Sequence, residues 1–179
     1  MGNCWFISAL SVLANNDEHI RGGGDVIDYQ NLSMIDNNTI QKCSIGVFPP
    51  IFHKFRVKGI YVLRFYKDYK WRYVVIDKKL PVVDYQLCFA KCVDEEELWV
   101  PLIEKAYAKL FGCYEALRSG NIDEGLVDMT AFACEKKTLQ DKSKNFTLNK
   151  DEFWTFINEM YKNGCLMGCS RSGGTEHAL

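Results

Sequence analysis

A cysteine and a histidine at opposite ends of the chain could together carry out nucleophilic chemistry. Cys4 directly precedes the apolar run 5–14, which predicts a helix that carries the thiol in its first turn. The N–H groups and the dipole at that helix end favour a thiolate, the form that attacks a carbonyl carbon. The imidazole that such a thiolate needs would come from His177, 177 − 4 = 173 positions away. Spacing alone leaves open that Cys4 is a buried structural cysteine.

The elements that must position these two side chains follow from hydrophobic periodicity and turn residues. The first helix is apolar almost all round, which places it inside a core. In order, the predicted elements are a helix over 4–15, a loop-rich variable region over 16–58, a hairpin with strands 60–66 and 71–76, a helix from near 97–100 to 117 interrupted near Gly112, a helix over 150–162, a strand over 165–170 and a strand beginning at 177.

The composition is that of an ordinary globular chain. Its 179 residues are 47% hydrophobic and 25% charged, enough for one sizeable core or two small lobes. The formal net charge of −1 offers no basic excess, so neither nucleic acid nor an anionic membrane is expected as a partner. No apolar stretch is long enough to span a bilayer, and the run at 5–14 lacks the basic flank of a signal peptide.

The eight cysteines bear on the compartment and on a metal-binding alternative. Without a signal peptide we expect a cytoplasmic protein with free thiols, seven of them small buried hydrophobes. Two pairs, Cys88 with Cys92 and Cys165 with Cys169, have spacings tolerable for zinc. The second pair lies in a predicted strand, which separates the two residues by about 13 Å at roughly 3.3 Å per residue. We therefore do not favour a zinc site.

Several ordered segments resemble the calpain family of papain-like cysteine proteases. Gly2-Asn3-Cys4-Trp5 looks like the family's nucleophile motif, Gly-Asp/Asn-Cys-Trp. The other similar segments are 73–81, close to Val-Val-Ile-Asp-Asp-x-Leu-Pro; 97–117, close to Glu-Phe-Trp, Leu-Leu-Glu-Lys-Ala-Tyr-Ala-Lys and Gly-Ser-Tyr-Glu-Ala-Leu; 166–170, close to the strand before the catalytic histidine; and 176–178, in the place of Gly-His-Ala. Residues 16–58 fit the family poorly.

The resemblance implies an α+β, papain-like fold in two lobes. Residues 1–120 would form the first lobe, with Cys4 on its central helix, and residues 121–179 would begin a β-rich second lobe bearing His177. Cys4 would be the nucleophile and His177 the general base and acid of an endopeptidase that forms a thioester acyl-enzyme. The resemblance also implies limited cleavage of intracellular proteins, calcium regulation and flanking regulatory domains. His19 and His53 match no motif, and we expect surface or structural roles for them.

Departures from the family pattern concern the catalytic machinery. The family's oxyanion-hole glutamine lies six residues before the cysteine, where this chain has three residues, and the Asn-Pro-Trp segment with the third catalytic residue does not occur. Glu176 replaces a glycine, and 129–132 replaces Phe-Thr-Gly-Gly. We therefore expect a fragment of a calpain core with little or no activity alone, because one lost oxyanion donor costs about 2.7–4 kcal/mol. The alternative is an inactive calpain-like module that acts by binding.

One carboxylate is a candidate calcium ligand. Glu97 matches the family glutamate that binds calcium in the first lobe, and carboxylate oxygen suits this hard cation. The family's other ligands of that site precede the cysteine. The alternative, which we favour, is that Glu97 and the acids 94–96 neutralise the positive end of the following helix.

Overall fold

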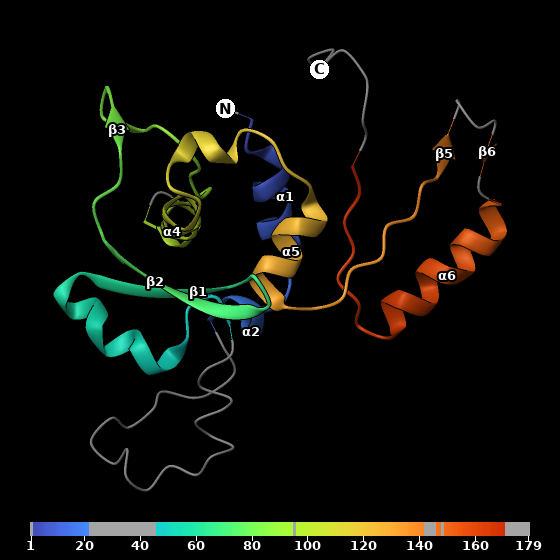
Figure 1. Cartoon of the computed structure of the whole chain (residues 1–179), viewed down its shortest axis with the longest axis horizontal. Helices are drawn as coiled ribbons and strands as arrows, with labels where there is room; N and C mark the ends of the chain where they lie inside the picture. The colour runs from blue at the N-terminus through green and yellow to red at the C-terminus, as the bar shows by residue number, and fades with distance from the viewer. Residues whose placement is uncertain (1, 22–45, 95, 142–145, 148, 171–179) are drawn as a thin grey trace, which may run out of the picture.

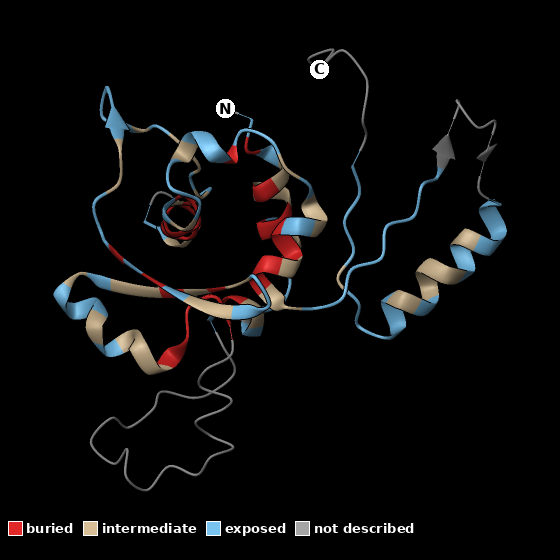
Figure 2. Cartoon of the chain, in the orientation of Figure 1, coloured by how far each residue is buried: buried red, intermediate tan, exposed pale blue. Residues whose placement is uncertain are grey.

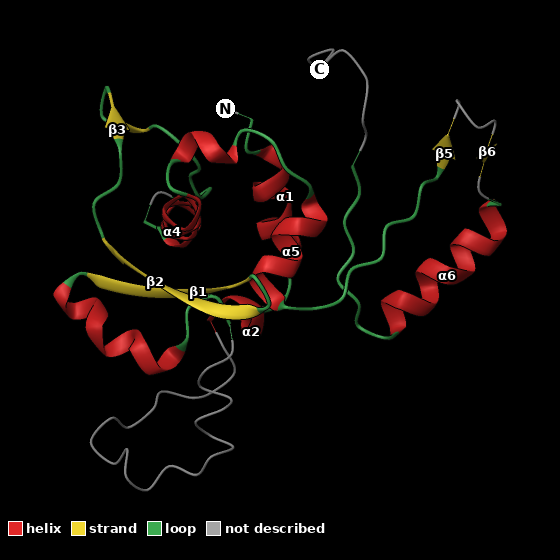
Figure 3. Cartoon of the chain, viewed as in Figure 1, coloured by secondary structure: helices red, strands yellow, loops and turns green. Residues whose placement is uncertain are grey.

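The computed structural model describes residues 2–21, 46–94, 96–141, 146–147 and 149–170 (Figure 1). Its elements in chain order are α1 (Cys4–Leu13), α2 (Asp17–Arg21), η2 (Pro50–Lys58, a 3-10 helix), β1 (Ile60–Lys67), β2 (Lys70–Asp77), β3 (Val82–Val83), β4 (Gln86–Leu87), α4 (Trp99–Phe111), η3 (Tyr114–Leu117, a 3-10 helix), α5 (Ile122–Thr130), β5 (Gln140–Asp141), β6 (Phe146–Thr147) and α6 (Lys150–Lys162). Helices and short two-stranded sheets are therefore mixed along the chain, consistent with the expected α+β class (Figure 3).

The buried core forms where α1, α4, α5 and the β1–β2 hairpin meet. Helix α1 packs against α5, while β2 runs beside α4 and β1 beside α5. Figure 2 shows buried residues along α1, α4 and α5, which lie above the hairpin in this view. The most deeply buried apolar side chains include Phe6, Ala9, Leu10, Leu13, Val47, Leu63, Phe65, Ile103, Ala106, Tyr107 and Leu117. This confirms the prediction that the first helix is a core helix.

The hairpin follows closely from the local sequence. β1 and β2 pair antiparallel from Ile60 opposite Asp77 to Lys67 opposite Lys70, as predicted within a residue or two. Its two-residue turn places Asp68 and Tyr69 at φ 52° and 60°, the geometry of a type I′ turn. This turn matches the twist of the strands, so the register follows from the loop length.

The helix predicted to end near 117 is divided, as expected, at Gly112. α4 ends at Phe111, and Gly112 takes φ 105°, a conformation that favours glycine. The chain then forms η3 before it passes through 118–121 into α5. The sequence analysis did not predict α5, although Asn121 and Glu124 carry its signal: the Glu124 carboxylate accepts the Asn121 backbone N–H at 3.4 Å.

The region 16–58 contains more order than the predicted loop. Asn16 caps α2, because its side-chain oxygen accepts the Glu18 N–H at 3.0 Å. Pro50 begins η2 and Pro49 is its N-cap, since proline suits the first turn of a helix. Gly59, at φ 73°, ends η2. Residues 22–45 lie outside the described part of the chain.

The segment after α5 agrees with the prediction in its helix and differs from it after that helix. α6 is present with the predicted bounds, and Asn149 caps it by accepting the Asp151 N–H at 3.0 Å. Residues 165–170 are not a strand, because no strand in the described residues lies beside them to form a ladder. They run past α1 and α5 instead, where a Cβ at Gly168 would lie 3.1 Å from Ile122.

The cysteines are more exposed than predicted. Cys4, Cys88, Cys113, Cys134, Cys165 and Cys169 are exposed, Cys92 is half-buried, and Cys43 lies outside the described residues. The seven described cysteines are free thiols. The expectation of burial was wrong because Cys88, Cys113, Cys134, Cys165 and Cys169 lie in connecting segments outside the helices and strands rather than in the core.

Candidate active site

Cys4 is the first residue of α1 and is exposed, whereas Phe6, Ala9, Leu10 and Leu13 form a buried face of this helix. Asn3 precedes it as the N-cap, and the Asn3 carbonyl accepts the N–H groups of Phe6 at 3.0 Å and Ile7 at 3.2 Å. The thiol therefore lies at the positive end of a helix that is anchored in the core. This is the placement that the sequence predicted for a nucleophile.

Trp5 fixes the orientation of the helix end next to the thiol. Its Nε1–H donates to the Leu117 carbonyl at 3.0 Å, and its ring meets Phe6 and Tyr107 edge-on at 5.7 and 6.1 Å. The ring lies so close to the backbone of Gly120 that a Cβ there would be 2.5 Å from it. Position 120 must therefore be glycine for the Trp5 indole to pack against it.

Gly2 meets a similar requirement on the other side of Cys4. A Cβ at this position would overlap the carbonyl oxygen of Arg118. The backbone leading into α1 thus passes directly against the connector that follows η3. Two glycines, Gly2 and Gly120, allow this close approach, and together with Trp5 they hold the start of α1 against 117–120.

A buried carboxyl from α4 contacts the residue before the thiol. Glu104 is 1% exposed; its Oε1 accepts the Asn3 side-chain Nδ2–H, and its Oε2 accepts the Ala90 backbone N–H at 2.8 Å. Burial is the main influence on Glu104 and raises the pKa of its carboxyl, while the two donors act in the opposite direction. Burial, with the Glu104 charge second, raises the pKa of Tyr114 to about 12.

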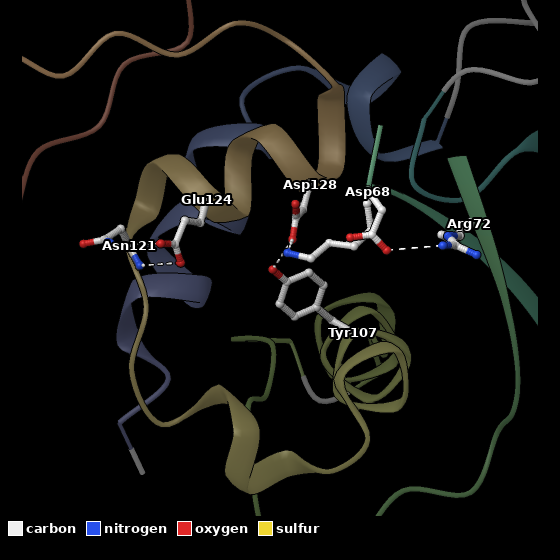
Figure 4. A network of polar contacts seen from close by, with 7 residues as sticks. Asp68, Arg72, Tyr107, Asn121, Glu124 and Asp128 are labelled. Carbon is white, nitrogen blue, oxygen red and sulfur yellow. Dashed lines mark hydrogen bonds and ion pairs between the residues drawn. The ribbon is translucent and has the colours of Figure 1, made fainter. Parts of the chain in front are cut away.

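A second buried carboxyl joins α5 to α4 and β1. The Tyr107 hydroxyl donates to Asp128 Oδ2 at 2.7 Å, and Figure 4 shows the two side chains pointing toward one another. Lys67 Nζ lies 3.2 Å from the same oxygen. Burial, followed by Asp128, raises the pKa of the Tyr107 hydroxyl, so it remains a donor. This network supports the scaffold rather than the surface at Cys4.

The sequence analysis missed Glu104, Asn3 and Asp128 as buried polar residues. A signal for Glu104 was present, because it stands inside the apolar face formed by Leu102, Ile103, Ala106 and Tyr107. Its partners could not be read from the sequence, since Asn3 is 101 positions away.

The histidine expected to pair with Cys4 lies outside the described residues, so the pairing stays a prediction. His19 is in α2, beyond the far end of α1, and ten residues of helix span about 15 Å. Its ring packs on Phe132, and burial lowers its pKa. His53 is in η2, with Nε2 at 3.1 Å from the Phe48 carbonyl. The structure places neither beside Cys4, which accords with the structural roles expected for them.

Glu97 lies exposed two residues before α4, and the Trp99 Nε1–H donates to its Oε2 at 3.0 Å. The described residues do not gather three or more His, Cys, Asp or Glu side chains into a metal-binding group. A lone exposed carboxylate with one oxygen already accepting a hydrogen bond does not fit the six to eight oxygen ligands that calcium takes. The described part of the chain therefore supplies no calcium cage at Glu97 and no zinc-binding group at the two cysteine pairs.

Within the same residues, the structure also lacks a helix with the length and apolarity needed to cross a bilayer.

Comparison with known proteins agrees with the resemblance. The family described as calpain family cysteine protease matches residues 1–178. The chain is 31% identical to calpain-10 of Mus musculus over 147 residues, which are 80% of this chain and 18% of that protein. It is 35% identical to calpain-5 of Caenorhabditis elegans over 145 residues, 79% of this chain and 19% of that protein. The chain is 30% identical to the calpain-type cysteine protease DEK1 of Arabidopsis thaliana over 177 residues, which are 98% of this chain and 7% of that protein.

The chain thus spans less than a fifth of the length of these relatives. The match nevertheless extends over nearly all of its own length, from before Cys4 through α4 and beyond α6. The chain belongs to the calpain family of cysteine proteases.

Proposed function

We propose that this chain is part of the catalytic core of a calpain-type cysteine endopeptidase, with Cys4 as the nucleophile and His177 as the general base and acid. The observation that carries the proposal is the exposure of Cys4 at the first position of a helix that is anchored in the core by a buried face. A cysteine whose only role is packing would not need an exposed position at the start of a helix. The family supports the same role, because its nucleophile motif coincides with residues 2–5.

The proposed reaction has two steps. Cys4 Sγ attacks the scissile carbonyl carbon as a thiolate, the peptide C–N bond breaks, and the departing amine takes a proton from the His177 imidazolium. A water molecule, activated by the now neutral imidazole, then attacks the thioester and releases the acid. Anchoring of α1 by Trp5 would keep the sulfur in place through both steps.

Further parts of the proposal concern the whole protein. We propose protein substrates cleaved at limited sites, calcium regulation, flanking regulatory domains and a cytoplasmic location. The two-lobe division at residues 120–121 belongs to the same proposal. Family membership supports these points, and the greater length of the relatives supports the flanking domains. Calcium regulation is supported by family membership alone. Glu97 takes no part in the proposed reaction.

The test is labelling of the full chain by a peptidyl epoxide of the cysteine-protease type, with intact mass and peptide mapping, with and without calcium. Selective modification of Cys4 that His177→Ala abolishes would support the proposal. Cys169→Ala is the matched control, since it removes another exposed thiol and should leave labelling unchanged. Uniform slow labelling of all exposed cysteines would contradict an activated Cys–His pair in this chain and would mean that the chain as given is catalytically incomplete.

A further inference from the structure

The buried carboxyl of Glu104 lies between three segments that are distant in sequence. Glu104 belongs to α4, its Oε1 contacts Asn3 at the start of α1, and its Oε2 contacts Ala90. Glu104 is 1% exposed and Asn3 is 9% exposed, so water does not substitute for either contact. Both contacts therefore act inside the protein, where an unmatched polar group is costly.

The two partners of Glu104 define what the site requires. The Asn3 amide and the Ala90 backbone are both N–H donors, so the group that meets them must accept at two positions. A carboxylate does this with its two oxygens, whereas a carboxamide has one acceptor and one donor. Among the described residues Glu104 has no ion-pair partner. An apolar side chain would avoid the cost of burying this charge, so packing alone does not explain the carboxyl.

Asn3 connects this carboxyl to the thiol. As the N-cap of α1, Asn3 holds the first turn through its backbone carbonyl, which accepts the N–H groups of Phe6 and Ile7. Its side chain makes no capping bond to the helix and is turned to Glu104 instead. The position of the first turn, and of Cys4 within it, thus depends on a bond to another helix.

We infer that Glu104 is a positioning residue for the Cys4 nucleophile, acting through the Asn3 side chain. This inference rests on the proposed function only where it calls Cys4 a nucleophile. The geometric part, that Glu104 holds the first turn of α1, can be tested without any activity. Glu104 touches neither the sulfur nor any reacting atom, so it is not a catalytic residue.

The first experiment measures amide hydrogen exchange by NMR in the full 179-residue chain, comparing wild type with Glu104→Gln. Glutamine keeps the shape but leaves one of the two donors facing an NH2 group. Exchange at Phe6 and Ile7 should become about twofold to tenfold faster. Exchange at Ala14, whose N–H donates to Leu10 at the other end of α1, should not change.

The matched control is Asp128→Asn, which makes the same carboxyl-to-amide change at another buried site. Asp128 is 6% exposed and is bound by Tyr107, without contact to Asn3. A role confined to general stability predicts that both variants alter the first turn of α1 equally. The positioning role predicts that only Glu104→Gln does so.

The second experiment measures how fast a peptidyl epoxide labels Cys4, with the exposed Cys169 alkylated by iodoacetamide as an internal reference. Glu104→Gln should slow Cys4 labelling about 10-fold to 100-fold, because small displacements of a reacting group are costly. The Cys169 rate should stay constant. Asn3→Ala should produce the same slowing, and adding Glu104→Gln to it should slow labelling little further.

The outcomes separate this inference from the proposed function. If wild type shows no selective Cys4 labelling but Glu104→Gln still accelerates exchange at Phe6 and Ile7, the proposed function fails and the positioning of the turn stands. If Cys4 of wild type is selectively labelled and Glu104→Gln changes neither exchange nor labelling, the inference is overturned. Should Glu104→Gln fail to fold, Asn3→Ala decides, and an Asn3→Ala variant with unchanged exchange and labelling overturns it.

Discussion

Replacing Gly120 with alanine should destabilise the protein and disturb the surface at Cys4. The added Cβ would lie 2.5, 2.6 and 2.8 Å from three atoms of the Trp5 ring, closer than van der Waals contact permits. The ring cannot easily move, because its Nε1–H is bonded to the Leu117 carbonyl and its faces meet other aromatic rings. The strain must therefore fall on α1 or on the connector at 118–121.

Overpacking of this kind costs about 1–3 kcal/mol. For a chain of this size that corresponds to a fall in Tm of about 2–12 °C. The free energy of unfolding is measured by urea titration followed by far-UV circular dichroism, which does not depend on the indole that is being displaced. Since Trp5 follows Cys4 directly, epoxide labelling of Cys4 should also slow.

Two further variants make the prediction specific. Ser119→Ala changes the exposed neighbouring residue and should alter stability by less than about 0.5 kcal/mol. Trp5→Phe, which shortens the ring, should reduce the cost of Gly120→Ala when the two are combined. Equal stability of Gly120→Ala and wild type, or full additivity with Trp5→Phe, would refute the steric argument.

Three other predictions follow from buried and half-buried groups. Tyr107→Phe removes the hydroxyl that donates to buried Asp128 and should cost about 1–3 kcal/mol in urea unfolding; a smaller loss would mean that another donor replaces it. Burial raises the pKa of the Glu104 carboxyl above its ordinary 4.5. The free energy of unfolding of wild type relative to Glu104→Gln should therefore be greatest below pH 4.5 and decline as pH rises through the folded pKa. A difference that does not depend on pH would contradict this shift. Burial also raises the pKa of the half-buried Cys92 thiol, so N-ethylmaleimide should label Cys92 more slowly than exposed Cys88 in peptide mapping, and equal rates would argue against it.

Elements whose signals lie within a few neighbouring residues could be predicted. The hairpin turn at Asp68 and Tyr69, the stop at Gly112 and the cap at Asn149 each depend on local backbone chemistry. The same kind of signal at Asn121 and Glu124 was available for α5 but was not used. Residues 165–170 were misjudged as a strand because a short apolar run does not by itself specify one: a strand needs a neighbouring strand, and all of these residues except Leu166 are exposed.

The features of the candidate site also divide into those that local sequence predicts and those that it does not. By its sequence alone, the chain determined its family, the position of Cys4 at a helix start and the partition of α4 from η3, because short motifs and periodicity encode these features. Only the tertiary structure decided that Glu104 meets Asn3, that Trp5 rests on Gly120 and that six of the described thiols are exposed. These contacts join residues up to 115 positions apart, and no local pattern specifies which distant group will satisfy a buried donor or fill a space.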